Sequence, residues 1–223
     1  MKLRLLLLLP LLVSTTACVA GDDSNGTSKI NGSVHVEAGQ APSDASSVNG
    51  SIEVAANARV EDASTVNGSI SLGDHAAAKS ADTVNGGVSL DDGAQVSGNI
   101  ESVNGALKLS PGAAVGGHAT NVNGHITIDG AHVGGQVETV DGDIDITGNA
   151  RVDGGLLVHK PDSGWFHFGI DRDPVVTIGP GATVNGTLKF ERPVKLYVSD
   201  RATVGQIVGA TPVKFSGDQP PAN

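Results

Sequence analysis

The 223-residue chain is poor in cysteine, in aromatic residues and in positive charge. Its one cysteine, Cys18, excludes a disulfide within the chain, so packing and hydrogen bonds alone must hold the fold. Aromatic residues make up only 3% of the chain, which argues against a wide core built from large rings. With 14 Lys and Arg against 24 Asp and Glu, the formal net charge is −10. Such an acidic chain is not expected to bind nucleic acid.

Glycine is abundant, with 31 residues, and one tripeptide keeps returning. An aliphatic residue, then Asn or Asp, then Gly recurs at steps of 18 or 19 residues. Recurrence at a nearly constant period indicates a repeat architecture. The copies are Ile30-Asn31-Gly32, Val48-Asn49-Gly50, Val66-Asn67-Gly68, Val84-Asn85-Gly86, Val103-Asn104-Gly105, Val122-Asn123-Gly124 and Val140-Asp141-Gly142.

Inside each repeat, an aliphatic residue returns every six positions, whereas an amphipathic helix needs spacings of 3, 4 and 7. The six-residue spacing favours short strands with inward side chains, separated by tight corners. Three such strands close a triangular coil, and successive coils stack as parallel strands about 4.8 Å apart. The prediction is an all-β fold, a single-stranded parallel β-helix (β-solenoid). Its inward positions would include Val48, Val54, Val60, Val66, Leu72, Ala78, Val84, Leu90, Val96, Val103, Val122 and Val140.

The Asn or Asp of the tripeptide forms the first set of candidate residues. Asn and Gly both tolerate the positive φ of a sharp corner. Stacking would also align the side-chain amides so that they hydrogen-bond along the solenoid axis. A structural ladder is the preferred interpretation, and a polar recognition stripe is the alternative. The set is Asn31, Asn49, Asn67, Asn85, Asn104, Asn123 and Asp141.

Residues 1–17 are predicted to be a signal peptide. Lys2 and Arg4 precede an apolar run that is too short to span a membrane, and small residues follow it. The end of this segment resembles the lipobox of bacterial lipoproteins, although Thr15 stands where that motif usually has Leu. The resemblance implies lipidation of Cys18 and a membrane partner through that anchor. By the family's sorting rule, Val19 implies the outer membrane. Cleavage after Ala20, giving a soluble periplasmic or secreted protein, is the alternative.

The rest of the chain divides by composition. Residues 18–29 are small and polar, as in a flexible tether, and residues 30–158 carry the regular repeat. Residues 159–174 interrupt it, 175–215 resume it as C-terminal coils and a cap, and 216–223 form a Pro-containing tail that is predicted to be disordered. The first coil is irregular at Pro42. Aligning Ile178–Val184 with Ile128–Val133 places Asn185-Gly186 at the second corner of its coil, not the first.

Half of the six aromatic residues lie within the interruption, at Trp165, Phe166 and Phe168. A loop that leaves a regular scaffold and concentrates aromatic residues is a candidate contact site. Three interpretations stay open. The segment forms a lateral cap over apolar surface, which is preferred, or it contacts a partner or a second copy, or it forms a ligand pocket.

Motifs for catalysis and metal binding are absent from the sequence. It has no GxSxG, P-loop or GxGxxG, and its seven histidines include no HxxxH pair. Asp141–Asp145 resembles the start of a calcium loop but lacks the Gly and the Glu of that motif, and strand alternation predicts that Asp143 and Asp145 face outward. We therefore predict no metal, no cofactor and no enzymatic activity.

The 18-residue coil with an aliphatic residue at every sixth position resembles bactofilins, cytoskeletal β-helix proteins that polymerise end to end. The units at 65–70 and 83–88 resemble the putative-adhesin repeats of bacterial envelope proteins, and residues 178–205 are similar to secreted proteobacterial members of the same group. A signal segment departs from the cytosolic bactofilins. The hexapeptide period also resembles left-handed β-helix acyltransferases, which would imply a catalytic histidine such as His118 or His125.

Taken together, these features predict a non-enzymatic β-solenoid lipoprotein of the cell envelope with a structural, adhesin-like or self-assembly role. Its partners would be the membrane, through Cys18, and a second copy or an envelope polymer or protein. The second hypothesis is a polysaccharide- or protein-binding module that uses the loop around Trp165. A hexapeptide-type acyltransferase is the third.

Overall fold

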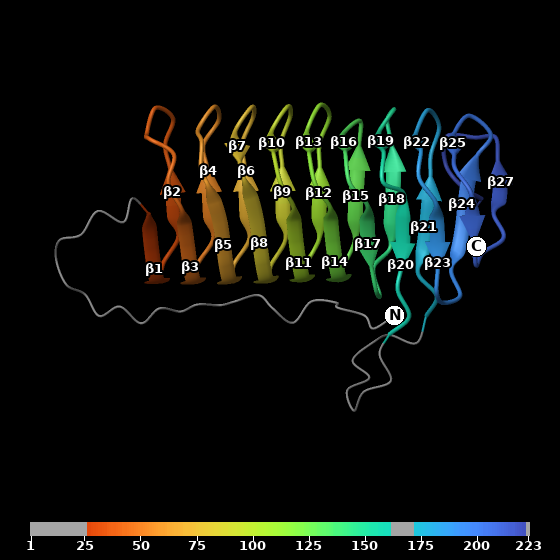
Figure 1. The fold of residues 1–223 in the computed structure, drawn as a ribbon, viewed down its shortest axis with the longest axis horizontal. Helices are drawn as coiled ribbons and strands as arrows, with labels where there is room; N and C mark the ends of the chain where they lie inside the picture. Colours follow the sequence, from red (N-terminus) through yellow and green to blue (C-terminus); the bar gives the residue numbers. More distant parts are fainter. Residues whose placement is uncertain (1–25, 162–171, 222–223) are drawn as a thin grey trace.

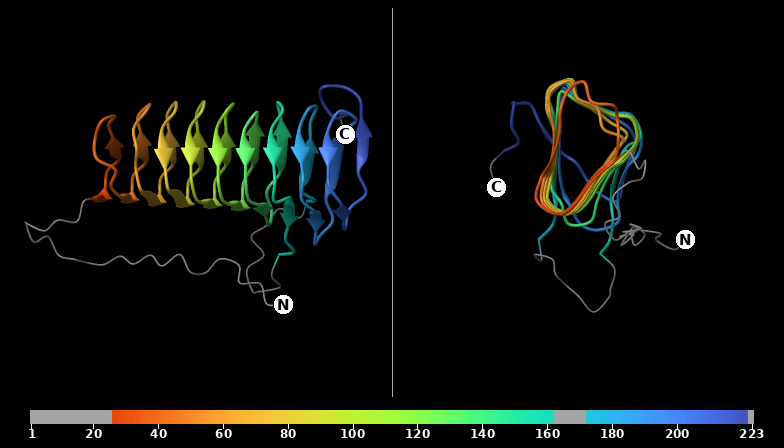
Figure 2. Two further views of the ribbon diagram at one scale, coloured as in Figure 1. Left: turned by 45° about the horizontal axis from the view of Figure 1, so that its top comes forward. Right: turned by 90° about the vertical axis from the view of Figure 1, so that its left-hand side faces the viewer.

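The computed structural model describes residues 26–161 and 172–221, and it confirms the β-solenoid. The chain winds around a triangular prism whose three faces are parallel sheets, with no helix among the described residues (Figure 1). Seen along the axis, the coils superpose on one triangular outline (Figure 2).

Sheets A and B each have ten strands and sheet C has seven. Sheet A contains β1 (Thr27–Asn31), β3 (Ala45–Asn49), β5 (Asp62–Asn67), β8 (Ser80–Asn85), β11 (Ile100–Asn104), β14 (Ala119–Asn123), β17 (Val137–Thr139), β20 (Leu156–Val158), β23 (Leu188–Phe190) and β26 (Ile207–Val208). Sheet B contains β2 (Val34–Val36), β4 (Ile52–Val54), β6 (Ile70–Leu72), β9 (Val88–Leu90), β12 (Leu107–Leu109), β15 (Ile126–Asp129), β18 (Ile144–Thr147), β21 (Val175–Ile178), β24 (Lys195–Ser199) and β27 (Val213–Phe215). Sheet C contains β7 (Ala77–Ala78), β10 (Gln95–Val96), β13 (Ala114–Val115), β16 (His132–Val133), β19 (Arg151–Val152), β22 (Thr183–Val184) and β25 (Thr203–Val204).

The register follows the repeat. The asparagines at the ends of β1, β3, β5, β8, β11 and β14 align with one another. Val184 pairs with Val152, which pairs with Val133, so Asn185 does lie at the second corner, as the alignment predicts. The first strand begins at Thr27, inside the segment predicted as a tether. The first coil has no strand in sheet C, and the Pro42 region is irregular.

The core is a narrow column of aliphatic side chains. Columns from sheet B, such as Ile52, Ile70 and Val88, meet small alanines from the other two faces, such as Ala63 and Ala76, and all are fully buried. Each coil buries its apolar surface mainly against the coils above and below, at about 25 cal/mol per Å². The alanines let three faces meet without room for aromatic rings, which accounts for the composition.

Five of the six tripeptide valines are not in this core, and their predicted inward orientation is wrong; the exception is Val140, which is buried at 7% exposure. The residue before each valine points inward, for example Ser47, Thr65 and Thr83, which are only 3–5% exposed. Because side chains alternate along a strand, the following valine faces out. The outward, half-buried valines are Val48, Val66, Val84, Val103 and Val122.

The predicted reason for Asn-Gly at this corner also needs correction. Of the tripeptide glycines, only Gly32 and Gly124 have positive φ. The residues with left-handed backbone gather instead at the corner between sheets B and C, as at Asn57, His75 and Gly93. Glycine is needed at the tripeptide corner because successive coils approach too closely for a side chain. A Cβ on Gly68 or Gly86 would overlap the carbonyl oxygen of the glycine one coil earlier.

Candidate functional site

The asparagines form a ladder on the outside of the corner between sheets A and B. Asn49 Nδ2 donates to Asn31 Oδ1 over 3.1 Å, and each later asparagine repeats this bond to the one before it. The remaining donor–acceptor pairs are Asn67 to Asn49 and Asn85 to Asn67, at 2.9 Å, and Asn104 to Asn85 and Asn123 to Asn104, at 3.1 Å. The bonds run parallel to the solenoid axis and join six coils.

Asp141 does not extend the ladder, contrary to the prediction. Each new member must donate an N–H to the oxygen of the previous side chain, and an ionised carboxylate has no proton to donate. Asp141 instead accepts from Arg192 Nη1, which also donates to the carbonyl oxygen of Val140 at 3.1 Å. The ladder therefore ends at Asn123.

Sequence reasoning missed a second, inner column of polar side chains. Ser47 Oγ donates to the carbonyl oxygen of Gly32 at 3.1 Å, and Thr65, Thr83 and Ser102 donate in the same way to Gly50, Gly68 and Gly86. These hydroxyls satisfy carbonyls that the corner leaves beside the core. The signal in the sequence is a Ser or Thr two residues before four of the six asparagines, Asn49, Asn67, Asn85 and Asn104.

Two arginines hold the C-terminal flank of the interrupting segment. Arg172 donates two hydrogen bonds to Asp143, at 2.9 and 2.7 Å, and the backbone N–H of Val175 donates to the same carboxylate at 2.8 Å. Burial acts to raise the pKa of Asp143, but these hydrogen bonds outweigh it and hold that pKa below its usual value. Arg192 reaches from the next coil to the carbonyl oxygen of Arg172 at 3.4 Å. The return of the chain into β21 is thus anchored on the corner that carries the asparagines.

Two of the sequence-based candidate sets lie outside the described residues. Trp165, Phe166 and Phe168 fall in residues 162–171, and Cys18 falls in residues 1–25. The contact site and the lipid anchor therefore stay predictions.

Five of the described histidines lie near carboxylates of neighbouring coils: His35, His118, His125, His132 and His159. His125 Nε2 lies 2.9 Å from Asp145 Oδ2, and that hydrogen bond raises the pKa of His125. His118 Nδ1 accepts from the backbone N–H of Gln136 at 3.1 Å and lies 3.9 Å from Glu138. The two candidate histidines thus interact with different carboxylates, and the structure does not bring them into one cluster.

His159 is the most enclosed of the described histidines. Its side chain is 8% exposed, and its Nε2 lies 2.9 Å from Glu138 Oε2. Its Nδ1 is 3.6 Å from Glu191 Oε2, which is too long for a hydrogen bond, and it has no hydrogen-bond partner among the described residues. These contacts join three successive coils immediately before the interruption.

Acidic side chains gather on the outer face of sheet A. Burial raises the pKa of Asp82 to about 6, and the nearby charge of Glu101 acts in the same direction. Ser80 Oγ donates to both Asp62 and Asp82, at 2.9 and 3.1 Å. Lys79, at the corner between sheets C and A, lies 3.2 Å from Asp62.

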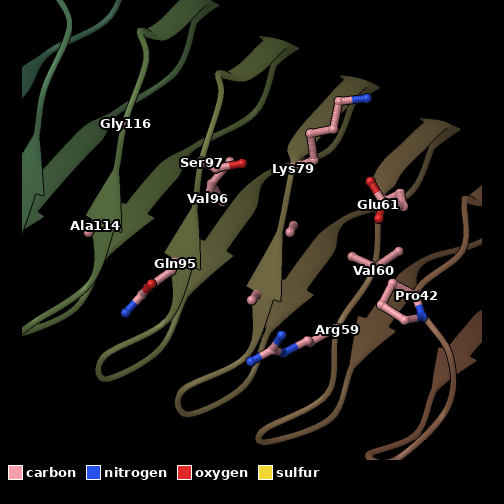
Figure 3. Close-up of a pocket in the computed structure, with 12 residues that line it drawn as sticks. Pro42, Arg59, Val60, Glu61, Lys79, Gln95, Val96, Ser97, Ala114 and Gly116 are labelled. Carbon is pink, nitrogen blue, oxygen red and sulfur yellow. The ribbon is translucent and has the colours of Figure 1, made fainter.

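A groove of about 470 Å³ lies on the outer face of sheet C near the N-terminal coils. Small residues such as Ala77, Ala114 and Gly116 line it, because short side chains leave the strands uncovered. Figure 3 shows Arg59 and Gln95 extending to one side of the groove and Lys79 to the other. Its lining includes no histidine, so it gives no support to the acyltransferase alternative.

Within residues 26–161 and 172–221, no group of three or more His, Cys, Asp or Glu side chains is arranged to hold a metal ion. Over the same residues, no helix is long and apolar enough to span a membrane. Comparison with protein-family models, curated proteins and solved structures gave no match.

Proposed function

We propose that this protein is a non-enzymatic structural rod of the bacterial cell envelope, tethered to the outer membrane through lipidated Cys18. The observation that carries the proposal is the unbroken stacking of coils from β1 to β27. Backbone ladders on the faces, the asparagine ladder on one corner and the buried hydroxyls beneath it all join one coil to the next. Ten strands spaced at about 4.8 Å give a rod roughly 43 Å long.

The order of the parts along the rod supports a spacer role. The predicted anchor and tether lead into β1 at one end. The interruption follows β20, the eighth strand of sheet A, which lies about 34 Å further along at the same spacing. A tethered rod of this kind would hold the aromatic segment at a fixed distance from the rod's tethered end.

The mature N-terminus tests the tether. Full-length protein is expressed in a Gram-negative host, its cell fractions are separated, and the N-terminal peptide is weighed by mass spectrometry. We expect an acylated Cys18 as the first residue, in the outer-membrane fraction, and a Cys18→Ser chain in the soluble fraction. An unmodified chain that begins at Gly21 in the periplasm or medium would contradict the proposal.

A binding role for the aromatic segment is the second candidate. It is favoured by the anchoring of the segment's C-terminal flank, where Arg172 and Arg192 hold the chain on Asp143 and Asp141. The test compares the wild-type chain with Trp165→Ala/Phe168→Ala for binding to purified cell-wall polysaccharide and to envelope membranes. Reduced binding by a variant with an unchanged circular dichroism spectrum supports this role, and equal binding rejects it.

A further inference from the structure

The large apolar side chains exposed in the described part of the chain all lie in the end coils. Ile30 in β1 is 72% exposed, and Val208 in β26 and Val213 in β27 are 42% and 50% exposed. Among the strands of residues 26–161 and 172–221, these are the first or last of their sheets, so each has one edge without a strand partner there. Exposed apolar residues on an open strand edge form a surface to which another copy can add.

A lysine sits beside the exposed isoleucine at the N-terminal end. Lys29 aligns with Ser47, and so occupies the column that the next four coils fill with the inward, buried hydroxyls of Ser47, Thr65, Thr83 and Ser102. Its Nζ donates to the carbonyl oxygen of Ser33 at 2.6 Å. Thus β1 carries a lysine in the column whose side chains face the core in the later strands of sheet A.

The C-terminal end has a lysine in a matching role on sheet B. In β21 and β24, Ile178 aligns with Val198 in the inward column. In β27 the residue aligned with Val198 is Lys214, which is exposed and follows the exposed Val213. Figure 2 shows the final segment crossing the open end of the prism.

We propose that Lys29 and Lys214 keep copies of this chain from adding end to end, so that the protein is a single rod of fixed length. A joint between two copies would place the first coil of one on the last coil of the other and would bury both ammonium groups without carboxylate partners. Removing each charge from water is strongly unfavourable, and this offsets the burial of the exposed apolar side chains at the joint. Inward-pointing charge on an edge strand is a known way of blocking edge-to-edge association. This inference concerns assembly alone and does not rest on the proposed tether.

The test replaces each lysine with the residue of the neighbouring coil in the same column, in the variant Lys29→Ser/Lys214→Val. The full-length chains are kept in the same detergent and compared by sedimentation velocity and negative-stain electron microscopy. The control is Lys108→Ser/Lys195→Ser, which removes two positive charges from strands inside the stack. Since both variants make an acidic chain more negative, general charge repulsion would oppose association equally in both.

We expect the wild-type chain and the control to sediment as one species whose size does not grow with concentration. The Lys29→Ser/Lys214→Val variant should form filaments one solenoid wide, and most of it should sediment into the pellet. Each single variant should form fewer filaments and leave more protein in solution. A Lys29→Glu/Lys214→Glu chain, which keeps a charge in each column, should stay unassembled. Filaments of the wild-type or Glu chain would overturn the proposal, as would a Lys29→Ser/Lys214→Val variant with a native circular dichroism spectrum that sediments like wild type.

Discussion

At the corner between sheets A and B, contacts with the neighbouring coil constrain each residue more than contacts within its own coil do. A glycine backbone lies on the glycine carbonyl of the coil before it, a hydroxyl bonds that carbonyl from inside, and an amide ladder runs outside. The period of the sequence is enough to predict that these asparagines stack. The period does not predict why glycine follows each asparagine. A close approach between coils and a positive φ both select glycine, so the sequence does not distinguish the two causes.

The first prediction at the residue scale concerns Gly86. A Cβ added there would overlap the carbonyl oxygen of Gly68 and force two coils apart. Gly86→Ala should lower the free energy of unfolding by about 3 kcal/mol, measured by urea denaturation. Gly217→Ala, where a Cβ meets only ordinary contacts, is the control and should change little. A neutral Gly86→Ala would contradict the close stacking of this corner.

A second prediction concerns the ladder. Asn67→Asp keeps the shape of the side chain but removes the N–H donated to Asn49 Oδ1, and it sets a carboxylate against that oxygen. We expect a loss of about 1 kcal/mol in unfolding free energy at pH 7. In the control Asn99→Asp, the side chain still accepts the backbone N–H of His118, as it does in the wild type at 2.9 Å. Equal stability of the two variants would mean that the ladder contributes nothing.

A third prediction concerns pH. Since the pKa of Asp82 is raised to about 6 in the folded chain, this carboxyl favours folding when protonated. Its contribution therefore falls as pH rises from about 4, the unfolded pKa, to about 6. Asp82→Asn should be about 1 kcal/mol more stable than wild type at pH 7, with the gain vanishing near pH 4. Asp74→Asn, at an exposed corner, is the control, and a similar gain there would reject burial as the cause.

At the scale of single elements, the strands of sheet A show the limit of the six-residue period. The predicted column of inward valines and the observed one differ by a single residue, because Ser47 or Thr65 faces the core and the valine after it faces out. A one-residue change reverses every side chain of a strand. Hydrophobicity alone could not reveal this, since the buried hydroxyls are stabilised by bonding a carbonyl that only the three-dimensional corner exposes.

The prediction at this scale concerns the start of β21. Asp143→Asn keeps an acceptor for the N–H of Val175 but weakens the charged pair with Arg172. We expect a loss of about 1.5 kcal/mol at pH 7 and faster amide hydrogen exchange in β21 than in β18. Because the folded pKa of Asp143 is lowered, this difference should fade as pH drops through that pKa. Asp145→Asn is the control; equal exchange in the two variants would show that Asp143 does not anchor the strand.

At the scale of the whole molecule, the repeat is enough to predict the solenoid, the interruption between β20 and β21, and the register of the last coils. The ends are not predictable from the period, because they are the places where it fails. The alignment of Lys214 with Val198 depends on how the chain crosses the last coil, and the role of Lys29 depends on which side chain of β1 faces the open end.

Disulfide formation between coils tests the stacking of 18-residue coils. The structure aligns Ser64 in β5 with Asp82 in β8 and places Ser80, on the same face, opposite Asp62. In a Cys18→Ser chain, the variant Ser64→Cys/Asp82→Cys should form a disulfide rapidly on mild oxidation, because stacked Cα atoms about 4.8 Å apart suit a disulfide. The variant Ser64→Cys/Ser80→Cys should not form one, since its two Cα atoms are about 8 Å apart. Linking of the second pair in preference to the first would contradict the 18-residue coil.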